Sequence, residues 1–178
     1  YLVHLYEEMG FDFFLNLNGW HNGIILDIKN GRAILFNDRF GIRRIYYHES
    51  ENAFVFASEA KALLSAFPAL RRPDVKSIAE FLVYDCVLEN RTYFSDIFLL
   101  PQASAWTLER SEARKRQYFD PASLEGQPLE KEDEFFEELS GTFVRTLPRY
   151  FHGDKIGMSL TGGLDTRMIM ACLNPSPG

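Results

Sequence analysis

The chain has 178 residues, of which 46% are hydrophobic and 15% aromatic, enough apolar material for one medium domain or for a small domain and part of a second. The formal net charge of -6 argues against a general nucleic-acid-binding surface, and no apolar run approaches the ~20 residues of a membrane span. Two distant cysteines and the lack of a secretion signal predict a cytoplasmic protein without a disulfide framework.

An amphipathic helix is predicted at the start of the sequence. Leu2, Leu5 and Tyr6 share one helical face, and Gly10 supplies a stop signal. The apolar pattern is already under way at Tyr1, with no capping residue before it. We therefore expect the chain to begin inside an element, as a fragment or a processed chain would.

Residues 18–57 predict antiparallel sheet, because short apolar runs alternate there with turn residues. The first two runs are joined across Asn30-Gly31, a dipeptide that supplies the positive φ angles of a tight hairpin turn. Runs this apolar should be covered on both faces, as in a sandwich whose sheets pack together and against helices. The strands expected are 23–28, 32–36, 45–48 and 53–57.

The middle of the sequence mixes helical and extended segments. Helices are predicted over 59–67 and, after the capping carboxylate of Asp74, over 75–84. The segments expected to be extended are 92–94, 97–100 and 103–108.

A basic run follows, which we interpret as a solvated linker rather than as a nucleic-acid contact. Its residues are Arg110, Arg114, Lys115 and Arg116. Loop-forming residues continue over 120–128, and a domain boundary is expected there.

The last third predicts helix, strand, turn and helix in succession. Acidic residues from Glu130 onward complement the N-terminus of a long helix, which Pro148 ends or kinks. Residues 155–160 are typical of a buried strand, and a new helix follows the turn after it. This order is typical of a parallel α/β sheet, but a lone parallel strand cannot satisfy its own hydrogen bonds. We therefore expect this second domain to be incomplete.

The turn at 161–166, Thr-Gly-Gly-Leu-Asp-Thr, predicts a phosphate site. It places bare backbone N–H groups and two hydroxyls at a helix N-terminus, where the partial positive charge favours anions. A Walker A loop requires a lysine that is missing here, and neither the dinucleotide fingerprint nor the hydrolase elbow matches the spacing. The alternative is an ordinary turn that uses glycine only for its backbone freedom.

Four segments, taken in order, resemble the motifs of a known enzyme family. Residues 37–47 resemble an R-D-R-x-G-x-x-P-L-Y-Y hairpin, and residues 56–64 resemble F-A-S-E-x-K-A-L-L. Residues 118–121 are similar to Y-W-D-P, and the turn at 161–166 is similar to the S-G-G-x-D-S pyrophosphate loop of ATP pyrophosphatases. Together they resemble glutamine-hydrolysing asparagine synthetases, over about residues 1–173.

The resemblance implies an ATP-dependent carbon–nitrogen ligase of asparagine biosynthesis, with glutamine as the amido donor. A class II glutamine amidotransferase domain would release ammonia, and a synthetase domain would adenylate the side chain of aspartate with ATP and Mg²⁺. The implied fold is part of an α+β N-terminal-nucleophile-type antiparallel sandwich, followed by the start of an α/β Rossmann-like ATP-pyrophosphatase domain. The partners implied are these small molecules, without nucleic acid or membrane, and the resemblance allows a homodimer.

The same resemblance implies domain boundaries and site residues. The segments are 1–72 for the C-terminal part of the amidotransferase domain, 73–128 for a connecting helix and linker, and 129–178 for the beginning of the synthetase domain. The residues implied to bind ATP or pyrophosphate are Thr161, Gly162, Gly163, Leu164, Asp165 and Thr166. Asp165 is also implied to hold Mg²⁺, and the alternative is a carboxylate that caps the new helix.

No residue of this sequence is assigned a glutaminase role. The family's nucleophile is a cysteine at the mature N-terminus, where this sequence has Tyr1, and the family's N-G-E-x-Y-N and S-D-x-E segments do not occur in it. We therefore expect the 178 residues alone to perform neither half-reaction.

Other positions also depart from the family or leave alternatives open. Asn37 stands where an arginine is usual, and Asp38 and Arg39 are interpreted as a charged pair that braces a hairpin. Arg167 either pairs with phosphate or points into solvent. Two rival interpretations remain for the whole: a non-catalytic amidotransferase-like module that binds a partner or ligand, and a relative that amidates another carboxylate.

Overall fold

The computed structural model describes residues 1–109, 113–153 and 155–173. Its contacts divide the chain into two compact units, Tyr1–Ser123 and Leu124–Gly178. None of the helices within the described ranges is long and apolar enough to cross a membrane.

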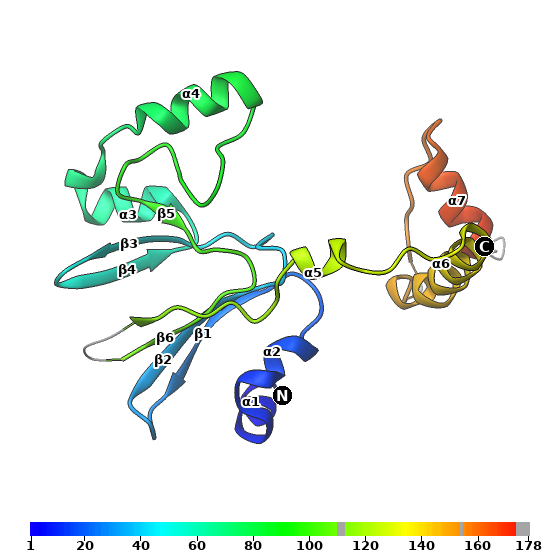
Figure 1. The fold of residues 1–178 in the computed structure, drawn as a ribbon, viewed down its shortest axis with the longest axis horizontal. Coiled ribbons are helices and arrows are strands. Elements are labelled where there is room, and N and C mark those ends of the chain that lie inside the picture. Colours follow the sequence, from blue (N-terminus) through cyan, green and yellow to red (C-terminus); the bar gives the residue numbers. More distant parts are fainter. Residues whose placement is uncertain (110–112, 154, 174–178) are drawn as a thin grey trace. The chain divides into compact units, whose positions relative to one another are not determined.

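The first unit contains two antiparallel sheets that pack face to face (Figure 1). Sheet A has the order β1 (Asn22–Asp27), β2 (Arg32–Asn37), β6 (Ala105–Leu108) and β7 (Ala113–Arg114). Sheet B has the order β4 (Ala53–Ala57), β3 (Tyr46–Ser50) and β5 (Phe98–Leu99). Between the sheets, Trp106 of β6 meets the ring of Tyr47 edge-on at 5.0 Å, beside buried Leu35.

The two predicted hairpins are confirmed. β1 pairs with β2 across the turn at Gly31, whose φ of 64° is the left-handed value that glycine permits. β3 pairs with β4, but this second hairpin belongs to the opposite sheet. The loop between β2 and β3 therefore carries the chain from one layer to the other.

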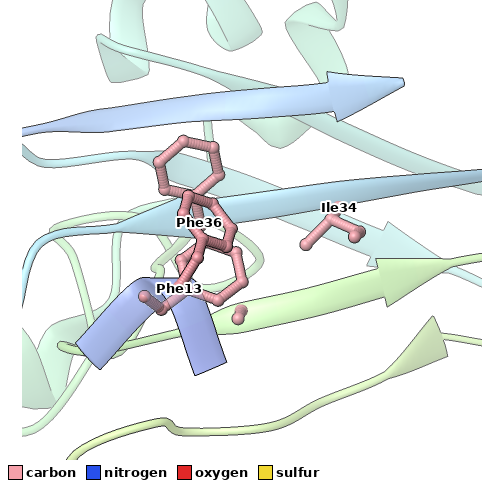
Figure 2. Close-up of a cluster of buried hydrophobic side chains, with 5 residues drawn as sticks. Phe13, Ile34 and Phe36 are labelled. Carbon is pink, nitrogen blue, oxygen red and sulfur yellow. The ribbon is translucent and has the colours of Figure 1, made fainter. Parts of the chain in front are cut away.

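Short helices cover the outer face of sheet A. They are α1 (Leu2–Met9), η1 (Gly10–Asp12) and α2 (Phe13–Asn16). Phe13 and Phe14 are both 0% exposed and pack against Ile34, Phe36 and Ala105 (Figure 2). The predicted opening helix and its stop at Gly10 are confirmed.

Another helical layer covers sheet B. It consists of α3 (Ala60–Ala66), η2 (Pro68–Leu70) and α4 (Val75–Tyr84), with a core formed by Leu63, Leu70 and Ile97. As predicted, Asp74 caps α4 by accepting hydrogen bonds from the backbone N–H groups of Lys76 and Ser77. The first unit is thus an α+β sandwich of helix, sheet, sheet and helix, which confirms the expected antiparallel architecture.

The basic run was expected to be a solvated linker: its described residues Arg114, Lys115 and Arg116 are solvent-exposed as expected, but they do not form a linker. β7 joins sheet A, Lys115 lies over the ring of Trp106 at 4.8 Å and pairs with Glu49, and Arg116 lies over the ring of Phe11 at 5.6 Å. The charged ends of these side chains lie over aromatic rings, which composition alone does not show. Arg110 lies outside the described residues.

The second unit begins after Ser123, where α5 (Ala122–Glu125) crosses the boundary. It contains α6 (Glu132–Thr146), η3 (Leu147–Tyr150) and α7 (Leu164–Leu173). The long predicted helix is confirmed, and it passes at Leu147 into a 3-10 turn that contains Pro148. The domain division at residues 72 and 128 stays a prediction.

The strand expected over 155–160 is not formed, and this corrects the expected Rossmann-like start. The described part of the second unit offers no other strand, so that a strand here would leave its N–H and C=O groups without a ladder. No Rossmann domain is evident in the described residues.

A polar network ties the first hairpin to α1. Asp27 Oδ2 accepts hydrogen bonds from the Tyr6 hydroxyl at 2.9 Å and from Arg32 Nε at 3.0 Å. The Asn30 backbone N–H and side-chain amide also donate to this carboxylate, at 3.1 and 2.8 Å. These hydrogen bonds lower the pKa of Asp27 to about 2, and the bond from the Asn30 side chain makes the largest contribution.

The stability of the first unit should therefore depend on the charge of Asp27 in acid. Because its folded-state pKa of about 2 lies below the unfolded value of about 3.9, its contribution is present above roughly pH 4 and is lost as the pH falls through 2. Asp27→Asn should lower the urea midpoint at pH 6, and the difference from wild type should shrink toward pH 2. A difference that is constant with pH would contradict this, and Asp12→Asn at an exposed carboxylate is the control.

Candidate functional site

The predicted phosphate turn lies directly before α7 and is solvent-exposed over 161–165. The glycines of the described residues that have positive φ are Gly10, Gly19, Gly31, Gly41 and Gly153. Gly162 and Gly163 are not among them, so this turn does not use the left-handed freedom of glycine. A Cβ added at Gly162 would meet no atom within 4 Å, which leaves open space beside the backbone.

Two hydroxyls hold the turn in shape. Thr161 Oγ1 accepts a hydrogen bond from the Gly163 N–H at 3.2 Å, and Thr166 Oγ1 accepts from the Thr161 N–H at 3.4 Å. Each hydroxyl accepts here and keeps its own O–H proton as a donor for another group. The first N–H groups of α7, beginning at Leu164, have no partner inside the helix.

Arg167 is solvent-exposed, as one of the two alternatives expected, but it also contacts the turn itself, which neither alternative included. Its Nε donates to the carbonyl of Gly163 at 3.3 Å and its Nη2 to the carbonyl of Gly162 at 3.4 Å. The guanidinium thus contacts the carbonyl oxygens of the turn. The available signal was spacing, because a side chain four residues after Gly163 leans back over the preceding turn of the helix.

Asp165 is exposed in the first turn of α7. No cluster of three or more His, Cys, Asp or Glu side chains that could hold a metal ion is found in the described part of the chain. Mg²⁺ is commonly bound by one or two carboxylates, with phosphate oxygens and water filling the other positions. Asp165 beside the open N–H groups of the turn therefore fits Mg²⁺ bound together with ATP, and the binding roles of residues 161–166 stay predictions.

Asp38 braces the loop after β2, but not by pairing with Arg39 as the sequence suggested. Its carboxylate is 1% exposed and accepts hydrogen bonds from the backbone N–H groups of Phe40, Ile42 and Arg43 at 3.2, 3.1 and 2.9 Å. Arg39 turns away, donates to the carbonyl of Leu15 at 3.3 Å and lies over the ring of Phe119 at 4.8 Å.

Asn37, which stands where an arginine is usual, is fully buried. Its Nδ2 donates to the carbonyls of Leu100 and Pro101 at 3.3 and 2.9 Å, and its Oδ1 accepts from the Ser104 N–H at 2.8 Å. Its own carbonyl accepts the Tyr118 hydroxyl at 2.8 Å. Both the NH₂ group and the oxygen of the Asn37 side chain are thus hydrogen-bonded, and these bonds join β2 to the segment before β6.

The Glutamine amidotransferase domain family matches residues 1–119, which include both sheets and the helices that cover them. The chain therefore belongs to the class II glutamine amidotransferases, and it is related to glutamine-hydrolysing asparagine synthetases.

Three curated relatives extend this picture. "Putative asparagine synthetase 2 (glutamine-hydrolyzing)" of Methanocaldococcus jannaschii is 25% identical over 97% of the chain and 34% of its own length. Asparagine synthetase 2 (glutamine-hydrolyzing) of Bacillus subtilis is 41% identical over 64 residues, 36% of the chain and 9% of the relative. Amidase chry2 of Gibberella zeae is 24% identical over 94% of the chain and 25% of its own length. The chain thus spans about a third or less of each relative.

Proposed function

We propose that the protein containing this chain is an ATP-dependent ligase that amidates the side-chain carboxylate of aspartate with ammonia from glutamine. The observation that carries the proposal is the turn at 161–166, which presents hydroxyls and unpaired N–H groups at the start of α7. It lies in the same chain as an amidotransferase domain, in a stretch that aligns with the Methanocaldococcus relative.

The proposed reaction needs both the amidotransferase domain and the turn at 161–166. Ammonia does not productively attack an anionic carboxylate, and adenylation by ATP converts that carboxylate into an electrophile with a good leaving group. The backbone N–H groups of Gly162 and Leu164 and the hydroxyls of Thr161 and Thr166 would hold the pyrophosphate. Asp165 would hold Mg²⁺ beside those phosphates.

The identity of the amidated acid is tested with a panel of carboxylates. Two relatives are named asparagine synthetases and a third is named an amidase, so aspartate is compared with other amino and carboxylic acids. The assay is acid-dependent release of pyrophosphate from ATP by the polypeptide of the whole reading frame. Aspartate should give the highest rate, and no release with any acid would contradict the ligase proposal.

Asp165→Ala should weaken binding of ATP with Mg²⁺ at least ~10-fold, a loss of about 1.4 kcal/mol, because the ion loses its protein carboxylate. Isothermal titration of the same polypeptide measures this. Asp133→Ala, at a carboxylate in the first turn of α6, is the matched control and should bind like wild type. Equal affinity in Asp165→Ala and wild type would remove Asp165 from the site.

A further inference from the structure

A cavity of about 940 Å³ is lined by residues of the first unit. Three segments line it: the residues that lead into β1, the end of the loop between β2 and β3, and the start of α3. The charged or aromatic side chains in its lining include Trp20, His21, Arg43, Arg44, Glu59 and Lys61.

Basic residues outnumber acidic ones in the lining of this cavity, although the formal net charge of the whole chain is -6. Glu59 lies 2.6 Å from Lys61 and neutralises it. Within the ranges that the structure describes, Arg43 and Arg44 have no carboxylate within ion-pair distance, and both are exposed. Arg43 and Arg44 thus line the cavity without a carboxylate partner among the described residues.

The backbone that carries these arginines is fixed from two sides. Asn22, the first residue of β1, donates through Nδ2 to the carbonyls of Arg43 and Arg44, both at 3.3 Å. The buried carboxylate of Asp38 accepts the Arg43 N–H at 2.9 Å. The two side chains therefore start from an ordered backbone, which reduces the entropy lost when they bind a ligand.

Beside the arginines, the cavity has an aromatic and an unsatisfied polar group. Trp20 is 71% exposed, although tryptophan is usually well buried. The Nε2 atom of His21 is buried and has no hydrogen-bond partner among the described residues. A buried polar atom of this kind normally meets water or a ligand.

We propose that this cavity binds a small multivalent oxyanion, a metabolite that carries phosphate or carboxylate groups, through Arg43 and Arg44. The planar guanidinium donates two parallel hydrogen bonds to either kind of oxyanion. This cavity shares no lining residue with the turn before α7, and the inference goes beyond the proposed function.

The test uses the fluorescence of Trp20 in the full chain, because the other tryptophan, Trp106, is only 4% exposed. Pyrophosphate and citrate, titrated separately in EDTA at ~0.15 M salt, distinguish a phosphate ligand from a carboxylate ligand. Wild type should respond saturably to at least one of them. Arg43→Gln with Arg44→Gln should raise the dissociation constant at least ~10-fold, while Trp20→Phe should abolish the signal and leave calorimetric binding in place.

The matched control removes two exposed arginines elsewhere, Arg71→Gln with Arg149→Gln, and should bind like wild type. Circular dichroism checks that the variants fold. If the double variant unfolds, the single variant Arg44→Gln replaces it, and its loss of binding free energy should be about half of that expected for the double variant. Asp165→Ala should leave this binding unchanged, so the two proposals fail separately. No saturable response to either anion, or equal losses in both double variants, would overturn the inference.

Discussion

Phe14→Ala is expected to lower the free energy of unfolding of the first unit by about 4 kcal/mol, within the 3–5 kcal/mol typical of a buried phenylalanine. The ring is 0% exposed, lies 5.2 Å from the ring of Phe36 and stacks on Tyr118 at 5.4 Å. Its loss removes buried apolar area and leaves a cavity between α2, β2 and the segment that ends the sandwich. Neither neighbouring ring can fill that space without giving up its own contacts.

Urea denaturation followed by the fluorescence of buried Trp106 measures this effect, because that residue belongs to the same unit. Phe67→Ala is the control at a phenylalanine that is 43% exposed, and its cost should stay below about 1 kcal/mol. Similar costs at the two positions would show that the cluster around Phe14 does not hold the sandwich together.

Asp38→Ala should cost about 3 kcal/mol of unfolding free energy. The Asp38 side chain is 1% exposed and accepts hydrogen bonds from three backbone N–H groups. In Asp38→Ala these N–H groups would remain near the core without the carboxylate as acceptor. Asp38→Asn should cost less, because its oxygen can keep the bonds from Phe40 and Ile42 while its NH₂ group faces the N–H of Arg43. This order distinguishes loss of hydrogen bonds from loss of packing.

Amide hydrogen exchange locates the effect within the loop. In Asp38→Ala the amide protons of Ile42 and Arg43 should exchange faster relative to those of β2. Asp12→Ala, at an exposed carboxylate, should change neither stability nor exchange there. A uniform change in exchange across the unit would contradict a bracing role for Asp38.

Local patterns predicted several helices and the first hairpin of this chain. Apolar spacing and caps placed α1, α4 and α6, and the Asn30-Gly31 turn placed the first hairpin. The pairing of β2 with β6 and of β3 with β5 could not be predicted in this way, because each pair joins residues far apart in sequence. The periodicity of a sequence indicates that a segment has an apolar face, but it does not indicate which other segment packs against that face.

For the same reason, the prediction of a strand over 155–160 was wrong and the cavity at Arg43 could not be predicted. A strand exists only beside a partner strand, and none is present in the described part of the second unit. The turn at 161–166 could be found from its glycines and hydroxyls because they are contiguous. The cavity combines Trp20, Arg43 and Lys61 from separate segments, so that only the folded chain brings them together.

The bond from the Tyr118 hydroxyl to the Asn37 carbonyl has a consequence for synthesis on the ribosome, because it spans 81 residues. At roughly 5–20 residues per second, the ribosome needs about 4 to 16 s to make that stretch. For most of this interval, until β6 has been made, the edge of β2 that later pairs with β6 has no partner. The β1–β2 hairpin is therefore open to mispairing along this edge until β6 has been made.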